Sequence, residues 1–185
     1  MKINTKNYFK FFLALVVCLS VRLLPFRAPN VEPILATLMP IGRAYGALAG
    51  LAFAVLSILL YDVVTGTIGV QTFFTVIAYG TLGLWAAHYF KNKKANKWSY
   101  VRFAIVGTFI YDALTGFTVG PLFFHQTFWG SLVGQIPFTM LHLLGNTVFA
   151  FILSPAIYDS LIKQRPRDLA QESSPLINPL QPKTI

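Results

Sequence analysis

The sequence predicts an all-α integral membrane protein, a bundle of six transmembrane helices with both chain ends in the cytoplasm. Of its 185 residues 55% are hydrophobic and only 11% charged, and the mean hydropathy is +0.61. A soluble domain carries about 25% charged residues. Long apolar runs recur between residues 8 and 158, and several are long enough to cross a bilayer. They lack the short alternating segments that are typical of a membrane β-barrel.

Breaks in the apolar runs divide the chain into six expected spans. The predicted spans are residues 8–25, 31–43, 44–62, 70–90, 100–116 and 132–158. The second span contains Pro33 and Pro40, and as a helix it reaches only about 20 Å, against a hydrocarbon thickness of about 30 Å. We therefore expect a tilted or broken helix that is enclosed by the bundle. The stretch GPLFFHQTFWG before the last span predicts a reentrant segment.

The positions of the basic residues predict the orientation. With a cytoplasmic N-terminus, 13 of the 15 Lys and Arg residues lie on the inner side, and only Arg22 and Arg27 lie outside. This asymmetry follows the positive-inside rule, and only an even number of spans produces it. The bases thus act as topology determinants, which argues against a nucleic-acid partner. We expect a membrane domain over residues 1–162 and, because residues 163–185 are polar and proline-rich, a disordered cytoplasmic tail.

One hexapeptide motif occurs twice. Residues 61–66 read YDVVTG and residues 111–116 read YDALTG, and Phe53-Ala54 aligns with Phe103-Ala104. Both copies close an odd-numbered span, so both face the same side. Two parallel halves related by an axis along the membrane normal would produce this pattern. Reuse of the same stop chemistry at two helix ends would also produce it, and the sequence leaves both readings open.

The acidic residues are scarce and unevenly placed. There are six Asp and Glu residues, of which Glu32, Asp62 and Asp112 fall at the outer ends of predicted spans. Carboxylates near hydrocarbon are costly unless they are paired or solvated in a cavity. Each acid alone fits a hydrated helix end. Because Asn30 and His125 fall at the same level, we favour a shared polar cavity that opens outward.

The last span carries a polar stripe. Ser131, Gln135, Thr139, His142 and Asn146 fall at i, i+4, i+8, i+11 and i+15, which is one face of a helix. Such a stripe is expected to face the interior of the bundle. It either lines the cavity or forms hydrogen bonds that hold the helices together.

These observations predict the contacts of a small ligand with a flat ring. Carboxylates would accept hydrogen bonds from ring N–H groups or amines, while imidazole and amides can donate or accept, and nearby aromatic rings could stack on a flat ligand. The predicted substrate-binding residues are Asn30, Glu32, Asp62, Asp112, His125, Gln135, His142 and Asn146.

Small residues on two spans permit close helix contacts. Gly46 and Gly50 on the third span, and Ala14 and Cys18 on the first, are predicted to contact a partner helix. For the glycines, tight packing inside the monomer is the favoured alternative.

Sequence motifs for catalysis are absent. The chain has no G-x-x-x-x-G-K-[ST] loop, H-E-x-x-H or G-x-S-x-G motif, and no Cys/His cluster, so we expect no enzyme, no cofactor and no metal site. An outer cavity without an internal nucleotide site indicates binding, with energy supplied by another protein.

Three segments, residues 27–69, 102–121 and 134–146, contain RAPNVEPILATLMPIGRAYGALAG, RFAIVGTFIYDALTGFTVGP and GQIPFTMLHLLGN. Together they resemble the substrate-binding S component of an energy-coupling factor (ECF) transporter, an ABC transporter subunit for vitamin uptake. The resemblance implies a prokaryotic plasma membrane and partnership with a transmembrane coupling subunit and two cytoplasmic ATPase subunits. The family's A-x-x-x-A-like run on the first helix is replaced here by Ala14 and Cys18, and no motif identifies the nutrient.

Two other function classes fit the same sequence. A non-transporting membrane scaffold would use the acids as hydrated helix ends and the polar stripe for helix packing. A stand-alone secondary carrier would use the acids to couple transport to protons or sodium.

Overall fold

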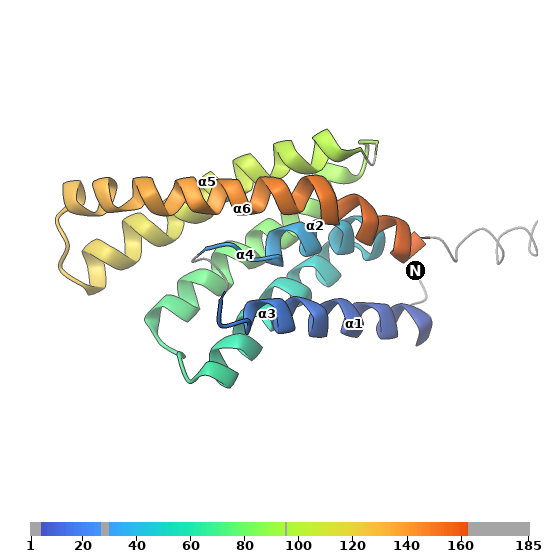
Figure 1. The fold of residues 1–185 in the computed structure, drawn as a ribbon, viewed down its shortest axis with the longest axis horizontal. Helices are drawn as coiled ribbons and strands as arrows, with labels where there is room; N and C mark the ends of the chain where they lie inside the picture. Colours follow the sequence, from blue (N-terminus) through green and yellow to red (C-terminus); the bar gives the residue numbers. More distant parts are fainter. Residues whose placement is uncertain (1–4, 27–29, 95, 163–185) are drawn as a thin grey trace, which may run out of the picture.

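The computed structural model describes residues 5–26, 30–94 and 96–162, and their regular secondary structure is entirely helical (Figure 1). The six helices are α1 (Thr5–Arg22), α2 (Ile34–Tyr45), α3 (Ala47–Thr65), α4 (Val70–Phe90), α5 (Lys97–Phe123) and α6 (Phe128–Ile162). Four of them, α3 to α6, are long and apolar enough to cross a membrane. The prediction of an all-α membrane protein is confirmed at this level. The predicted tail, residues 163–185, lies outside the described residues.

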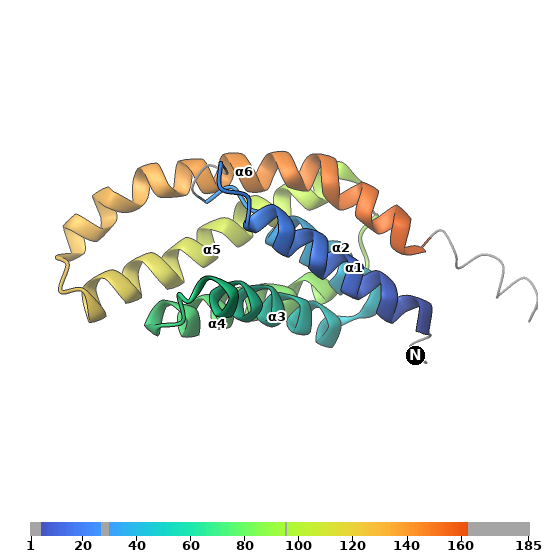
Figure 2. The same ribbon diagram turned by 60° about the horizontal axis from the view of Figure 1, so that its bottom comes forward.

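The helices form two antiparallel pairs with α1 and α2 between them. The α3–α4 pair and the α5–α6 pair lie on opposite sides of the bundle, and the α5–α6 hairpin extends beyond the others (Figure 2). The start of α1 and the end of α6 meet at one end, where Lys10 Nζ donates a hydrogen bond to the carbonyl oxygen of Ser160 (2.6 Å). Both ends of the described helical domain therefore lie on the same side of the bundle.

The short helix α2 lies at the centre. It contacts all five other helices, and its residues 34–42 are buried without interruption. Pro40 lacks the N–H that would bond to the carbonyl of Ala36, and Ser154 Oγ of α6 donates to this carbonyl instead (2.7 Å). The expectation that the bundle encloses the second helix is confirmed, and the helix runs without a break from Ile34 to Tyr45. A neighbouring helix satisfies the freed carbonyl, as non-ideal helices at membrane depth require.

The glycines of the α2–α4 region serve the fold itself. Gly46 has φ 96° and separates α2 from α3, a conformation that favours glycine. A Cβ on Gly50 would overlap the carbonyl oxygen of Gly83, so α3 and α4 cross with their backbones in contact. Gly50 is buried in this crossing and cannot face a partner helix. The alternative of packing inside the monomer is correct for Gly50.

The two copies of the repeated hexapeptide end differently. Gly66 adopts a left-handed conformation with φ 68° and ends α3, whereas Gly116 remains inside α5, which continues to Phe123. The predicted end at residue 116 is wrong because α5 stays paired with α6, where the side chain of Gln135 fills the space that a Cβ at Gly116 would need. The predicted reentrant segment is wrong as well, since its ends belong to α5 and α6 and only residues 124–127 form the turn.

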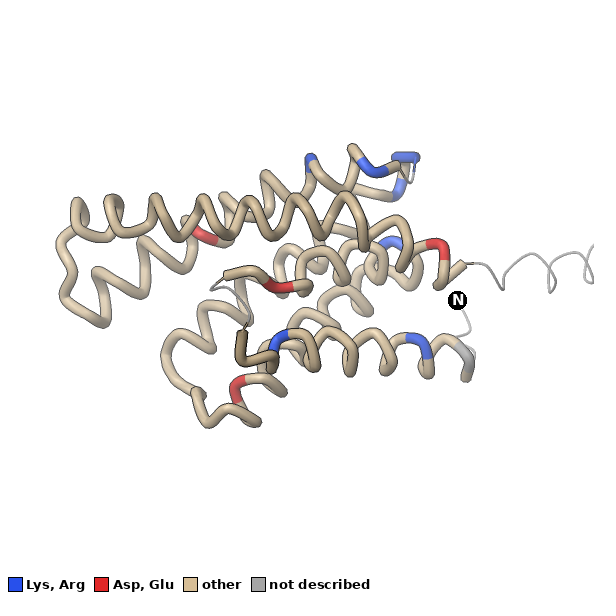
Figure 3. Tube along the Cα trace, viewed as in Figure 1, with Lys and Arg blue, Asp and Glu red and all other residues tan. Residues whose placement is uncertain are grey.

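Charged residues divide between the two ends of the bundle (Figure 3). The described bases gather at the end where α2 meets α3 and α4 meets α5, except for Arg22 at the end of α1. The acidic positions of α3, of α5 and of the stretch before α2 lie away from that end, whereas the acidic position of α6 lies near it. The sequence pattern of inner bases and outer acids thus corresponds to a spatial separation.

Candidate functional site

The aspartates of the two hexapeptides occupy equivalent positions. Asp62 is 9% exposed and Asp112 is 2% exposed. Each contacts the next helix along the chain: Thr72 Oγ1 of α4 donates to Asp62 Oδ2 (2.5 Å), and His142 Nδ1 of α6 lies 2.8 Å from Asp112 Oδ1. The repeated motif therefore joins α3 to α4 and α5 to α6 in the same manner, through a buried carboxylate.

A polar cavity of about 230 Å³, here called the central cavity, opens among the helices beside Asp62. Its lining comes from α1, the α1–α2 connection and α3 to α6. The lining residues are Arg22, Asn30, Glu32, Ile58, Asp62, Gln71, Thr75, Tyr111, Phe138 and His142. Four of the eight predicted ligand contacts, Asn30, Glu32, Asp62 and His142, thus surround one space.

A chain of polar contacts runs along one side of the central cavity. Arg22 Nε is 3.0 Å from Glu32 Oε2, and Tyr79 Oη donates to Glu32 Oε1 (2.7 Å). The same Tyr79 oxygen lies 3.4 Å from His142 Nε2, and His142 Nδ1 contacts Asp112. These five side chains are all buried. They link α1, the α1–α2 connection, α4, α5 and α6 through their polar groups.

The backbone before α2 positions Glu32. Asn30 has φ 63°, and Pro33 precedes the first residue of α2. Val31 lies directly against Gly145 of α6, where an added Cβ would come within 3.1 Å of the Val31 Cα. Because Gly145 allows this approach, Glu32 reaches the face of α6 that carries His142.

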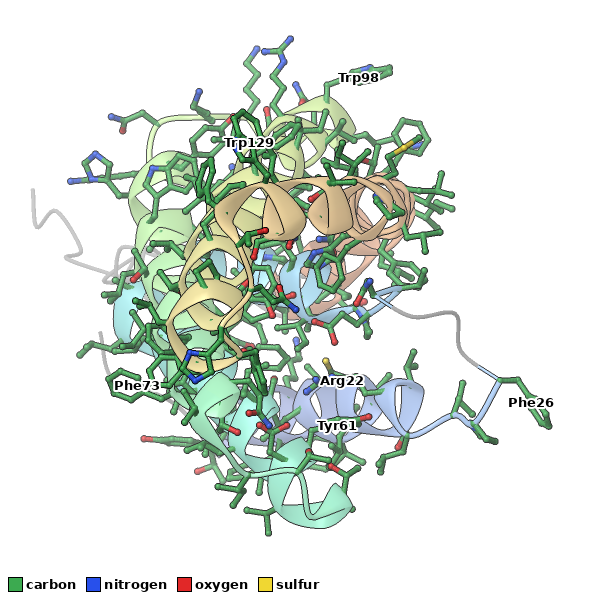
Figure 4. All side chains as sticks on the ribbon, turned by 90° about the vertical axis from the view of Figure 1, so that its left-hand side faces the viewer. Arg22, Phe26, Tyr61, Phe73, Trp98 and Trp129 are labelled. Carbon is green, nitrogen blue, oxygen red and sulfur yellow. The ribbon has the colours of Figure 1, made fainter. Side chains whose placement is uncertain are left out.

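Several contacts stabilise the buried guanidinium group of Arg22. Its Nη1 donates to the carbonyl oxygen of Ser57 (2.7 Å), and its guanidinium lies 3.9 Å from the centre of the Tyr61 ring (Figure 4). With the Glu32 ion pair, these contacts hold the guanidinium at the edge of the central cavity. Arg22 is therefore a member of the site and not simply a base at a membrane surface.

Two predicted ligand contacts lie behind the central cavity, in the α5–α6 interface. Asn146 Nδ2 donates to Thr108 Oγ1 (2.8 Å), one turn from the contact between His142 and Asp112. Asp112 Oδ2 and Asn146 Oδ1 are buried and have no hydrogen-bond partner among the residues that the structure describes. Neither residue lines the central cavity, so both support it through their neighbours.

The remaining two predicted contacts lie elsewhere. Gln135 lines a second cavity of about 570 Å³ in the α5–α6 hairpin, together with Gln126 and Ser131. His125 is exposed on the turn between these helices, with φ 52°. Phe138 lines both cavities and forms a common wall. The single predicted site is thus divided into a central cavity, a buried support and a separate hairpin cavity.

The polar stripe of the last helix faces inward as predicted. Ser131, His142 and Asn146 are buried and Gln135 and Thr139 are half-buried. Apolar residues occupy the opposite, exposed face: Val133, Met140, Leu144 and Val148. The stripe serves both expected purposes, because His142 lines the cavity while Asn146 bonds to α5.

An apolar groove of about 910 Å³ follows α1 and α6 on the outside of the bundle. Ala14 and Cys18, the predicted partner-helix contacts of the first span, both line it, with Lys10 among the other lining residues. Contact with a partner helix stays a prediction for these two residues.

Sequence reasoning missed Arg22 as a cavity residue and did not find Tyr79. The presence of only two bases, Arg22 and Arg27, beside three acids at the outer end was a usable signal for Arg22. Tyr79 lies in an apolar run with no polar periodicity, so only the three-dimensional packing reveals its contact with Glu32. Within the described part of the chain, no three His, Cys, Asp or Glu side chains lie close enough to form a metal site.

Comparisons with protein-family models, with curated proteins and with solved structures gave no match. Interpretation of the site therefore depends on its own geometry and chemistry.

Proposed function

We propose that the protein is the substrate-binding membrane subunit of an ECF-type ABC transporter, which captures a small vitamin-like or heterocyclic nutrient from the outer side of a prokaryotic plasma membrane. In this proposal the six helices act as six spans and both chain ends are cytoplasmic. The observation that carries the proposal is the central cavity, because its charged and amide side chains converge from separate helices on a space large enough for a small molecule. Ligand sites in helical membrane proteins are built in this way.

The position of the cavity supports capture from outside. The end of the bundle that holds most bases is cytoplasmic by the positive-inside rule. Glu32 precedes α2 and Asp62 lies near the end of α3, so both belong to the opposite half of the bundle. A ligand would reach the cavity from the non-cytoplasmic face.

The partners follow from what the chain lacks. Its sequence holds no phosphate-binding loop of the Walker type, so ATP-driven uptake needs separate ATPase subunits and a transmembrane coupling subunit. The apolar groove along α1 and α6 offers the coupling subunit a surface beside Ala14 and Cys18. The other exposed apolar side chains of the helices face the lipid bilayer.

A copurification experiment tests the proposal. The protein is extracted in mild detergent, and native mass spectrometry measures any small molecule that stays bound. We expect a bound nutrient in the parent protein and its loss in Asp62→Asn, which changes the cavity charge while keeping the side-chain shape. Asp159→Asn is the matched control, because Asp159 is exposed on α6 and far from the cavity. A parent protein that carries no ligand and supports no uptake with the ATPase subunits contradicts the proposal.

The hydrogen-bonded pairs of the interior favour a second candidate, the membrane scaffold. Asp112 contacts His142, and Asn146 donates to Thr108. Interhelical hydrogen bonds of this kind also hold purely structural bundles together. A scaffold predicts no bound ligand and normal membrane assembly of Asp62→Asn. A secondary carrier, the third class, predicts uptake into vesicles that contain this chain and no ATPase subunit.

A further inference from the structure

The charges around the central cavity do not cancel. Among the described residues, its bases are matched: Arg22 pairs with Glu32, and His142 contacts Asp112. Asp62 forms no ion pair with any residue that the structure describes, and its side chain accepts hydrogen bonds only from hydroxyl groups. Within residues 5–26, 30–94 and 96–162, the lining of the central cavity therefore holds one carboxyl group, that of Asp62, without a cationic partner.

Asp62 accepts hydrogen bonds from threonine hydroxyl groups. Thr72 Oγ1 donates to Oδ2 (2.5 Å) and Thr67 Oγ1 lies 3.4 Å from Oδ1. Thr72 belongs to the first turn of α4, whose N-terminus bears a partial positive charge that stabilises a carboxylate. Hydroxyl donors bring no positive charge, so the Asp62 carboxyl group lies beside the cavity without a cationic partner among the described residues.

Arg22 does not supply the missing positive charge. Its guanidinium is held by Glu32, by the Ser57 carbonyl and by the Tyr61 ring. Binding an anionic ligand would require Arg22 to leave these contacts. It would also bring a second negative charge toward Asp62, which costs free energy in a poorly solvated site.

The size and the lining of the central cavity further restrict the kind of ligand that it can bind. A volume of about 230 Å³ equals that of about eight water molecules at roughly 30 Å³ each, which suits a molecule with about eight non-hydrogen atoms. Tyr111 and Phe138 provide aromatic walls, which attract cations through their ring faces. Gln71 and Thr75 add neutral polar groups to the lining.

We propose that the central cavity binds a small organic cation, a protonated amine whose ammonium group contacts the Asp62 carboxylate. This inference rests on the proposed function, since it assigns the charge class of the captured nutrient. Asp62 accepts a charge-assisted hydrogen bond from the ammonium group, and the aromatic walls contact the rest of the ligand. Arg22 and Glu32 remain paired and form the polar edge of the site.

Three aromatic probes of similar size and different charge test the inference: benzylammonium, benzyl alcohol and benzoate. Thermal unfolding of the detergent-solubilised protein at neutral pH measures their binding. We expect benzylammonium to raise the Tm of the parent protein in a concentration-dependent manner, while benzyl alcohol gives a smaller shift and benzoate none. In Asp62→Asn the apparent affinity for benzylammonium should fall by about tenfold to 100-fold, the range for loss of a hydrogen bond to a charged group. Asp159→Asn should behave as the parent.

Three results would overturn the inference: a larger shift with benzoate, equal shifts with all three probes, or no shift with benzylammonium at tens of millimolar. Equal affinity of Asp62→Asn and the parent for benzylammonium would also overturn it. The copurified molecule separates this failure from failure of the proposed function. A neutral or anionic nutrient in the native protein contradicts the cation inference and leaves nutrient capture standing, whereas absence of both a bound nutrient and ATP-driven uptake contradicts capture itself.

Discussion

The contact between Asp112 and His142 makes the sharpest prediction about stability. The two side chains are each 3% exposed, and their closest atoms lie 2.8 Å apart. Asp112 Oδ2 already lacks a partner, so His142→Ala would leave both carboxylate oxygens buried without a hydrogen bond. Breaking a buried pair by removing one partner costs about 3–5 kcal/mol. We expect His142→Ala to lower the free energy of unfolding by this amount.

A double-mutant cycle isolates the contribution of the pair. In Asp112→Ala/His142→Ala no charge remains unpaired, so the double variant should be more stable than the sum of the two single changes predicts. The expected coupling is at least about 2 kcal/mol, within the range for residues in direct contact. Reversible unfolding in mixed detergent and dodecyl sulfate micelles, followed by circular dichroism, measures all four proteins.

The control cycle combines His142→Ala with Asp159→Ala. Asp159 is exposed on the same helix, and seventeen residues of helix separate the two positions by about 25 Å, so their effects should add. Additive effects of Asp112→Ala and His142→Ala would refute the reasoning, because they would show that neither side chain depends on the other. The same cycle matters for function: a single alanine at either position changes stability, so Asp62→Asn is the cleaner test of binding.

Three further substitutions each test one contact or surface described above. Gly83→Ala places a Cβ against the backbone of α3 and should lower the free energy of unfolding by about 1–3 kcal/mol. Gly134→Ala is the control, because nothing lies within 4 Å of its Cβ, and it should be neutral or stabilising. Equal effects of the two changes in the same micelle assay would contradict the close crossing of α3 and α4. Tyr79→Phe removes the donor to Glu32 (2.7 Å) and should destabilise by about 1–3 kcal/mol, so unchanged stability would show that this hydrogen bond contributes little. Ala14→Trp fills the apolar groove and should fold normally but fail to copurify with the coupling subunit, whereas undiminished copurification would exclude this groove as the docking surface.

The sequence predicted the number and order of the helices because apolar length and breaking residues report both directly. The bounds of α4 agree with the predicted span, residues 70–90. The end of α5 did not follow, since Thr-Gly ends α3 at Gly66 but not α5 at Gly116. A glycine ends a helix only when no neighbour holds the next turn in place, and the partner helix α6 is known only from the fold.

The sequence predicted which polar residues face the interior better than it predicted which of them lie around the same cavity. The scarcity of acids correctly indicated that Glu32 and Asp62 lie around one cavity. The helical spacing of the polar stripe correctly predicted that His142 faces the interior of the bundle. Gln135 shares the helical face of His142 but lies about two turns away, beside a different cavity. Spacing along one helix defines a face, whereas the division of that face between cavities depends on where the other helices end.

The central position of α2 has a consequence for how the protein is made in the cell. At 12 residues α2 is about 18 Å long, too short to be held stably by the lipid on its own. The carbonyl that Pro40 leaves free is satisfied by Ser154, which belongs to α6, the last of the six described helices along the chain. The second helix therefore reaches its final surroundings only after α6 has been synthesised, and a chain truncated before α6 should be degraded by membrane proteases.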